Sequence, residues 1–214
     1  MSRRERRLIV WRHGNTDWNA GGRVQGQADV PLNEVGHRQA ADAAELLRPL
    51  RPTAIVASDL RRAVDTAVAL ARLTGLPVRC DRRLRERHFG AWQGMLMTDV
   101  AQTRPDEYAR WRAGADLVGG GVETLDDLGK RVAEALDAAA ELMPAGGTVV
   151  VATHGGAARQ GIGHLLGWPR EVVRTLRALQ NCHWVEVTHD DARGWQLAAY
   201  NVGAFADQPV PAPV

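Results

Sequence analysis

Histidine and arginine side chains recur in this sequence directly after short apolar segments that have the composition of buried strands. The three cases are Arg12 and His13 after residues 8–11, residues 58–62 after residues 53–57, and His154 after residues 148–152. Ligands of open α/β sheets collect beyond the carboxyl ends of the strands, so these side chains are expected to converge. Two histidines, two arginines and a nearby acid suit phosphoryl transfer, because the reacting group spreads negative charge over its oxygens and needs positioned positive donors.

The elements that must position these residues follow from the spacing of apolar side chains. Within residues 34–47 the apolar positions recur at spacings of three and four, which predicts a helix with one buried face. Ser58 or Asp59 can cap a second helix, and Thr124 can cap a long third one. A further helical pattern follows His154.

Three more segments complete the predicted strands, and they set the fold class. Residues 78–80 form a short strand, and residues 184–187 and 196–200 form an antiparallel pair. Strands alternate with helices, and no internal repeat or interdomain linker is apparent, which indicates an α/β fold with a mainly parallel sheet. We expect a single domain over residues 1–206, followed by a flexible tail over residues 207–214.

The composition is that of an ordinary globular protein. Hydrophobic residues make up 45% of the 214 residues and charged residues 24%, which gives no case for a largely disordered chain. The 27 Lys and Arg against 25 Asp and Glu leave a formal net charge of +2. This overall charge predicts neither a nucleic acid nor a membrane surface as a partner, so any anion site must be local.

No targeting or membrane segment is apparent. Residues 8–11 are too short for the apolar core of a secretory signal, and they run directly into Arg12 and His13. No window approaches the ~20 apolar residues that span a bilayer. Cys80 and Cys182 are too few to suggest a disulfide framework. We therefore expect a cytoplasmic protein.

The segment around His13 resembles a known family signature. Residues 8–16 read Leu-Ile-Val-Trp-Arg-His-Gly-Asn-Thr, similar to the Arg-His-Gly-(Glu/Gln/Asn)-(Ser/Thr) signature of the histidine phosphatase, or phosphoglycerate-mutase-like, superfamily. The similarity continues, in the family's order, over residues 18–19, 23–26, 31–36, 58–67, 84–94 and 154–156. Within the superfamily, residues 58–94 most resemble the glucosyl-3-phosphoglycerate phosphatase branch. The resemblance implies a three-layer α/β/α fold of the phosphoglycerate-mutase type, with helices on both faces of the sheet.

The resemblance also implies roles for the residues at the strand ends. His13 matches the nucleophile, which attacks phosphorus in line to form a phosphohistidine that water then hydrolyses. Arg12 and Arg62 match the family's phosphate clamp, in which planar guanidinium groups bind phosphate oxygens bidentately. His154 matches the second catalytic histidine, which donates to the phosphoryl oxygens. Arg61 is the alternative to Arg62, but the family's catalytic arginine directly precedes an Ala-x-x-Thr-Ala segment, which favours Arg62.

The same matching supplies a proton donor and substrate contacts. Glu86 aligns with the family's acid, which protonates the leaving alkoxide and then accepts a proton from water. The alternative is an exposed loop carboxylate that pairs with a neighbouring arginine. The expected contacts to phosphate or substrate are Thr16, Asn19, Gln25 and Gly26, and Gly155 lets the start of the next helix approach closely. No metal and no cofactor are expected.

These residues predict a metal-independent phosphomonoesterase for a small phosphorylated metabolite, either a sugar phosphate or a phosphoglycerate derivative such as glucosyl-3-phosphoglycerate. The alternative is a cofactor-dependent phosphoglycerate mutase, which needs extra cations for a second anionic group. Where the mutase pattern has a Leu-Asn-Lys run, a tyrosine and paired arginines, this chain has residues 95–97, Phe89 and only isolated arginines. A non-catalytic module that binds phosphate ligands is the second alternative. The expected partner is a small phosphate ester, and a homodimer is left open.

Overall fold

A computed structural model describes residues 6–117 and 120–203 of the chain. Within these residues six strands form one sheet in the order β3-β2-β4-β1-β5-β6. The strands are β1 (Arg6–Arg12), β2 (Ala54–Ala57), β3 (Val78–Cys80), β4 (Thr148–Thr153), β5 (Trp184–Asp190) and β6 (Gly194–Val202). Neighbours from β3 to β1 pair in parallel, whereas β5 is antiparallel to both β1 and β6. The predicted mainly parallel sheet is therefore confirmed.

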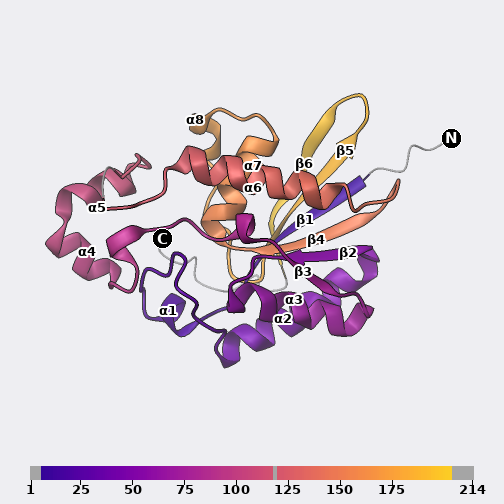
Figure 1. Ribbon diagram of the computed structural model, residues 1–214, viewed down its shortest axis with the longest axis horizontal. Coiled ribbons are helices and arrows are strands. Elements are labelled where there is room, and N and C mark those ends of the chain that lie inside the picture. The colour runs from indigo at the N-terminus through magenta and orange to yellow at the C-terminus, as the bar shows by residue number, and fades with distance from the viewer. Residues whose placement is uncertain (1–5, 118–119, 204–214) are drawn as a thin grey trace.

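Helices cover both faces of this sheet (Figure 1). The helices α2 (Glu34–Leu47) and α3 (Arg61–Thr74) lie on one face, and α6 (Leu125–Ala140), α7 (Gly155–Leu165) and α8 (Arg170–Val173) lie on the other. Side chains of β1 alternate between the two layers, as the geometry of a strand requires. Ile9 and Trp11 pack with the α2 and α3 side, while Leu8 and Val10 pack with the α6 and α7 side. The three-layer α/β/α architecture is thus as expected.

Shorter elements lie beyond one end of the sheet (Figure 1). They are α1 (Asp17–Ala20), α4 (Met97–Thr103), α5 (Pro105–Arg112) and the 3-10 turn η3 (Gly90–Trp92); two further turns, η1 (Arg48–Leu50) and η2 (Arg82–Leu84), follow α2 and β3. A separate apolar cluster holds this region together, with Val24, Phe89, Trp92, Val100 and Leu117 buried in it. The carboxyl ends of β1, β2 and β4 therefore open toward a cap that has its own small core.

The start of α3 differs from the sequence-based expectation. Neither Ser58 nor Asp59 caps this helix: its N-cap residue is Leu60, which makes no side-chain cap hydrogen bond. The Ser58 hydroxyl lies 2.8 Å from Nε2 of His154, and the Asp59 carboxylate accepts two hydrogen bonds from Arg85 at 2.7 Å. Both polar side chains have partners in tertiary structure that spacing along the chain could not show.

The N-cap of α6 agrees with the prediction, whereas several strands extend beyond their predicted ends. Thr124 caps α6 as predicted, because its side chain accepts from the backbone N–H of Asp127 at 3.0 Å. Several strands are longer than their apolar cores, since pairing continues through polar residues such as Arg7, whose guanidinium pairs with Glu186 at 2.8 Å. The expected tail over residues 207–214 lies outside the described residues.

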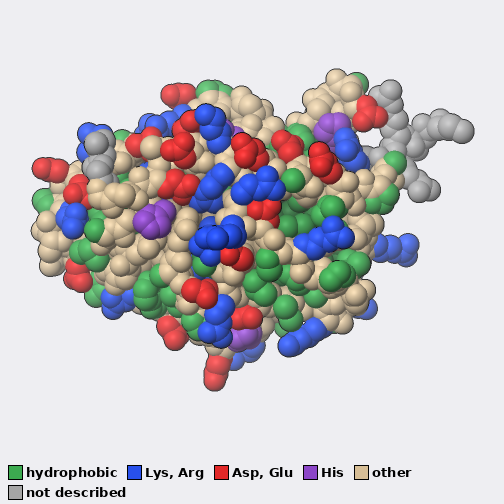
Figure 2. Space-filling view, viewed as in Figure 1, with side chains coloured by type: hydrophobic (Ala, Val, Ile, Leu, Met, Phe, Trp, Pro, Cys, Tyr) green, Lys and Arg blue, Asp and Glu red, His purple; other side chains and the backbone are tan. Residues whose placement is uncertain are grey.

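The surface carries charges of both signs. Figure 2 shows basic and acidic side chains interspersed on the face that carries α6. This mixture fits the net charge of +2. None of the described helices has the length and apolar composition needed to cross a lipid bilayer.

Candidate active site

His13 lies at the carboxyl end of β1 and is buried, with 3% of its surface exposed. Its Nδ1 is 2.7 Å from the carbonyl oxygen of Gly14, which can only accept, so Nδ1 carries the proton. The Nε of Arg62 donates to Nε2 of His13 at 3.3 Å, which requires an unprotonated Nε2. These two contacts fix one tautomer and leave the lone pair of Nε2 inside the site.

The environment of His13 also keeps its ring neutral. Burial lowers the pKa of His13 well below its ordinary value, and the positive charges of Arg62 and Arg12 lower it further. The hydrogen bond to Gly14 acts in the opposite direction but is the smaller effect. The imidazole is therefore available as a nucleophile at neutral and mildly acidic pH.

His154 follows β4 and stands beside His13, with the ring centroids 5.2 Å apart in an edge-on arrangement. Its Nε2 lies 2.8 Å from the Ser58 hydroxyl. Its Nδ1 is buried and has no hydrogen-bond partner among the described residues. Burial, followed by the charge of Arg62, also lowers the pKa of His154 well below its ordinary value.

Two buried arginines supply the positive charge. Arg62 on α3 donates to the carbonyl oxygens of Ala28 at 2.7 Å and Gly26 at 2.8 Å, which holds it against the loop that follows α1. Arg12 donates to the carbonyl oxygen of Leu179. Burial lowers the pKa of Arg62 to about 10 and also lowers that of Arg12, so both remain cationic at neutral pH.

Two buried nitrogens in this cluster lack partners. Nε of Arg12 and Nδ1 of His154 make no hydrogen bond within residues 6–117 and 120–203. A buried polar group without a partner costs roughly 1–3 kcal/mol, and such groups in native proteins usually bind a ligand or water. With two arginines beside them, these nitrogens are suited to an anion that accepts several hydrogen bonds, such as a phosphoryl group.

Glu86 lies at the amino end of α7. Its Oε2 accepts from the backbone N–H of Gly156 at 2.9 Å, and its Oε1 accepts from those of Ala157 at 2.9 Å and Arg87 at 2.8 Å. This position also benefits from the positive end of the helix dipole. A Cβ at Gly156 would lie 2.6 Å from Oε1 of Glu86, so a larger residue there would displace this carboxylate. The sequence places Gly156 in the matching motif over residues 154–156 but indicates a role at the site only for its neighbour Gly155.

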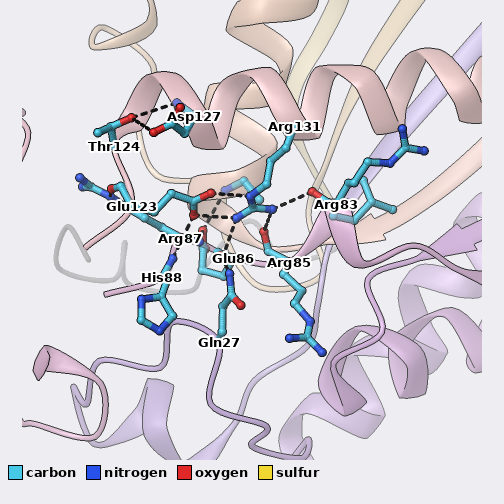
Figure 3. Close-up of polar contacts among 12 residues, drawn as sticks. Gln27, Arg83, Arg85, Glu86, Arg87, His88, Glu123, Thr124, Asp127 and Arg131 are labelled. Carbon is cyan, nitrogen blue, oxygen red and sulfur yellow. Dashed lines mark hydrogen bonds and ion pairs between the residues drawn. The ribbon is translucent and has the colours of Figure 1, made fainter. Parts of the chain in front are cut away.

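A side chain on α6 holds the segment that carries Glu86 through hydrogen bonds to the backbone of that segment (Figure 3). Arg131 donates to the carbonyl oxygens of Arg83 at 2.7 Å, Arg85 at 2.6 Å and Glu86 at 2.9 Å. Glu123 binds the same guanidinium through both carboxylate oxygens, at 2.5 and 2.8 Å. The Arg131–Glu123 pair therefore fixes the backbone at Glu86. Sequence reasoning missed Arg131, since it resembles any polar residue on an exposed helix face.

A cavity of about 370 Å³ opens beside this cluster. Most of the residues that the sequence indicated line it: Arg12, His13, Asn19, Gln25, Gly26, Arg62, Glu86 and Gly155. His154 is not in the lining and lies beside the ring of His13. Thr16 is also outside the lining, fully buried at the N-cap of α1. The expected residues thus converge, except that Thr16 does not reach the cavity.

Thr16 instead positions Asn19. The hydroxyl of Thr16 accepts from the backbone N–H of Asn19 at 3.1 Å, and Oδ1 of Asn19 accepts from the backbone N–H of Thr16 at 3.2 Å. This reciprocal capping box fixes the start of α1. Asn181 also donates to Oδ1 of Asn19 at 3.4 Å and to the carbonyl oxygen of His13 at 2.9 Å. Nδ2 of Asn19 makes no hydrogen bond to a described residue and can donate to a ligand.

The rest of the cavity is largely apolar but carries further cations. Its apolar lining comes from different elements and includes Trp18, Phe89, Met97, Trp111, Leu125 and Leu128. Arg23, Arg87 and Arg159 also line it. The expectation that the site lacks extra cations for a second anionic group is therefore wrong. The three arginines come from separate segments, so no local motif reveals them.

The buried histidines predict how the stability of the protein depends on pH. An unfolded histidine titrates near pH 6.5, whereas the pKa values of folded His13 and His154, and also of His183, are lower. Between those values the unfolded chain binds more protons, so stability is fully present above about pH 6.5 and is lost as the pH falls. We expect the melting temperature to decrease from pH 7 to pH 5, by about 2–4 °C for each kcal/mol lost.

Thermal denaturation at a series of pH values measures this effect. Replacing both histidines of the site, as His13→Gln with His154→Gln, should reduce the pH dependence, because His183 is then the only one of the three titrating groups that remains. The matched control is His37→Gln, which removes an exposed histidine on α2 and should leave the slope unchanged. Equal slopes in all three proteins would contradict this account of the site.

Comparisons with known proteins agree with this geometry. A family model of the histidine phosphatase superfamily (branch 1) matches residues 8–203. A glucosyl-3-phosphoglycerate phosphatase of Mycolicibacterium vanbaalenii is 41% identical over 210 residues, which cover 95% of this chain and 91% of the relative. A probable phosphoglycerate mutase of Yersinia enterocolitica is 37% identical over 211 residues, covering 94% of this chain and 95% of that protein. A solved structure of a mycobacterial glucosyl-3-phosphoglycerate phosphatase in complex with VO3 superimposes with a TM-score of 0.84 at 37% identity, covering 92% of this chain and all of that one. The chain therefore belongs to the histidine phosphatase superfamily.

Proposed function

We propose that this protein is a metal-independent phosphomonoesterase that hydrolyses a small phosphorylated metabolite through a phosphohistidine at His13. The observation that carries the proposal is the arrangement around Nε2 of His13. This atom is held unprotonated beside Arg62, and the partnerless nitrogens of Arg12 and His154 belong to the same buried cluster. These side chains supply the positive charge that phosphoryl transfer needs.

In the first step, Nε2 of His13 attacks phosphorus and the bond from phosphorus to the ester oxygen breaks. Glu86 in its protonated form gives its proton to the departing oxygen. Arg12, Arg62 and His154 donate hydrogen bonds to the three remaining oxygens as their charge grows. In the second step, water attacks phosphorus, Glu86 takes a proton from it, and the bond to His13 breaks. The enzyme then returns to its starting protonation state and releases phosphate.

The lining of the cavity supports a substrate class. A lining with Phe89, Met97 and Trp111 gives apolar surface beyond the phosphate position, which suits a leaving group larger than a three-carbon acid. A relative that is 41% identical to this chain over 210 residues is named for glucosyl-3-phosphoglycerate. We therefore propose a sugar phosphate or phosphoglycerate derivative of this kind as the substrate, and the cytoplasm as the place where such a metabolite is met.

A mutase is the second candidate, because a relative at 37% identity is named a probable phosphoglycerate mutase and extra arginines line the cavity. The test is incubation with 3-phosphoglycerate and a metal chelator, with and without 2,3-bisphosphoglycerate. Release of phosphate without 2-phosphoglycerate supports the phosphatase, and a panel of sugar phosphates and glucosyl-3-phosphoglycerate then ranks its substrates. Isomer formation that depends on the bisphosphate would establish the mutase instead. No turnover of any ester would favour a binding module.

The proposal gives Arg131 a positioning role that can be measured. Arg131→Met removes the hydrogen bonds to three backbone carbonyls at and before Glu86, and we expect kcat/KM for alkyl phosphates to fall by about 10- to 100-fold. The loss should be larger for alkyl phosphates than for p-nitrophenyl phosphate, since only alkyl leaving groups need the proton of Glu86. The control is Lys130→Met, whose ammonium is exposed and lies 3.6 Å from Asp126. A folded Arg131→Met protein with equal losses on both substrates would contradict this role.

A further inference from the structure

Arg159 lines the active-site cavity, and it differs from the neighbouring arginines in the contacts of its guanidinium. It lies on α7, four residues after Gly155, and lines the cavity. Its Nε is buried and makes no hydrogen bond to any described residue, the same condition found at Nε of Arg12. No ion pair joins its guanidinium to a carboxylate in the part of the chain that the structure describes. A cationic side chain that reaches a cavity without a partner is suited to bind an anionic group of a ligand.

The other two arginines beyond the phosphate position are already engaged. Arg23 donates to the carbonyl oxygen of Gly94 and lies over the ring of Trp18, 5.9 Å from its centroid. Arg87 donates to the carbonyl oxygen of Glu123 at 2.7 Å and pairs with Asp116 at 3.2 Å. Arg159 is therefore the cation of this lining that a ligand can use without breaking a contact within the described residues.

The spacing of Gly155 and Arg159 along α7 suits a three-carbon acid. A Cβ at Gly155 would lie 3.4 Å from Nε of Arg12, which places the start of α7 against the arginine proposed to bind phosphate. Arg159 follows four residues later, ~6 Å farther along the helix axis and on the same face. A skeleton of three carbons, with phosphate at one end and carboxylate at the other, can span this separation.

A second cavity reinforces the positive charge at Arg159. It measures about 210 Å³, adjoins the first through Trp111, Leu125, Arg159 and Gln160, and is also lined by Arg112, Arg170 and Arg174. Among the described residues, Glu86 is the only acidic side chain in either lining. Arg170 pairs with Asp116 at 3.2 Å, and the remaining arginines of the lining raise the local potential for anions.

We propose that Arg159 binds the carboxylate of a phosphoglycerate unit and so selects substrates whose phosphorylated three-carbon chain ends in a carboxylate. This inference rests on the proposed phosphatase function and specifies its substrate class. It makes Arg159 a specificity-determining residue, whereas the residues that bind the phosphoryl group act on every ester. The rest of the cavity, which is large and partly apolar, can accommodate a group attached to the glycerate unit.

Two esters that differ only at the carboxylate test the proposal. 3-Phosphoglycerate and glycerol 3-phosphate share the phosphate and the three-carbon chain, and we would measure kcat/KM for both with the wild type and Arg159→Gln. We expect the variant to lose roughly ten- to hundredfold on 3-phosphoglycerate, the effect of removing a hydrogen-bonded charge, and to keep its activity on glycerol 3-phosphate. Arg159→Lys, which keeps the charge, should lie between the two proteins. The control is Arg38→Gln, which removes an exposed charge on α2 and should change neither value.

The outcomes separate this proposal from the proposed function. Equal losses on both esters, or no loss on either, would overturn the role of Arg159. Turnover of p-nitrophenyl phosphate with no preference of the wild type for 3-phosphoglycerate over glycerol 3-phosphate would also overturn it, while the phosphatase would stand. If no ester is hydrolysed, the phosphatase fails instead, and calorimetric titration of the same two esters into both proteins still tests whether Arg159 recognises the carboxylate.

Discussion

Replacing His13 with alanine is expected to lower phosphatase turnover by about 10⁴- to 10⁶-fold, the range seen when a nucleophile is removed from a preorganised site. The His13→Ala protein lacks Nε2 of His13, the only protein atom that forms a bond to phosphorus in the proposed mechanism. Arg12, Arg62 and His154 remain, so the variant should still bind inorganic phosphate. Steady-state assays with p-nitrophenyl phosphate give the rate, and the rise of melting temperature with added phosphate gives the binding.

The binding measurement distinguishes loss of chemistry from loss of fold. A His13→Ala protein that melts cooperatively and is stabilised by phosphate, but does not turn over, agrees with the proposed role. Residual activity within about tenfold of the wild type would contradict it, because general electrostatic stabilisation cannot replace covalent catalysis to that extent.

The second large effect is expected at Glu86, and it should depend on the leaving group. Glu86→Gln keeps the shape of the side chain but cannot give a proton to the departing oxygen. For an alkyl phosphate we expect kcat/KM to fall by about 10²- to 10⁴-fold, the usual contribution of a general acid. For p-nitrophenyl phosphate, whose leaving group departs as a stable phenolate, kcat/KM should change little.

The second half of the reaction gives an independent reading of the same variant. Water attack also uses Glu86, so p-nitrophenyl phosphate should produce a rapid burst of product equal to the enzyme present, followed by slow turnover. The control is Glu134→Gln, a carboxylate on α6 outside the cavity lining. Equal losses on alkyl and aryl esters, with no burst, would mean that Glu86 positions the backbone of α7 and does not transfer protons.

The fold was predictable because its signals are local. Residues 8–11 and 148–152 are apolar runs of strand-forming residues, and the spacing of residues 34–47 marks a helix, so each element is apparent without its partners. The convergence of Arg12, His13 and His154 followed from a general property of parallel strands, whose carboxyl ends meet at one edge of the sheet. Known motifs then assigned an expected role to each residue.

The supporting contacts were not predictable, because their partners lie far away in the sequence. Arg131 binds backbone carbonyls that are 45 to 48 positions away, and Ser58 lies against His154 across 96 positions. Spacing along the chain predicts Ser58 as a helix cap, whereas in the structure its hydroxyl lies against His154. Arg159 carries no local sign of its place in a cavity, which depends on how α5, α6 and α7 meet.

The most direct test of the account is to trap the phosphoenzyme. Glu86→Gln would be mixed with p-nitrophenyl phosphate, quenched in alkali, where phosphohistidine survives, and analysed by intact mass and peptide mapping. We expect one phosphoryl group per chain, located on His13 and formed within the burst. It should be absent from the His13→Ala, Glu86→Gln double variant. Product release without any phosphoenzyme, or a phosphoryl group on His154, would contradict the central claim that Nε2 of His13 is the nucleophile.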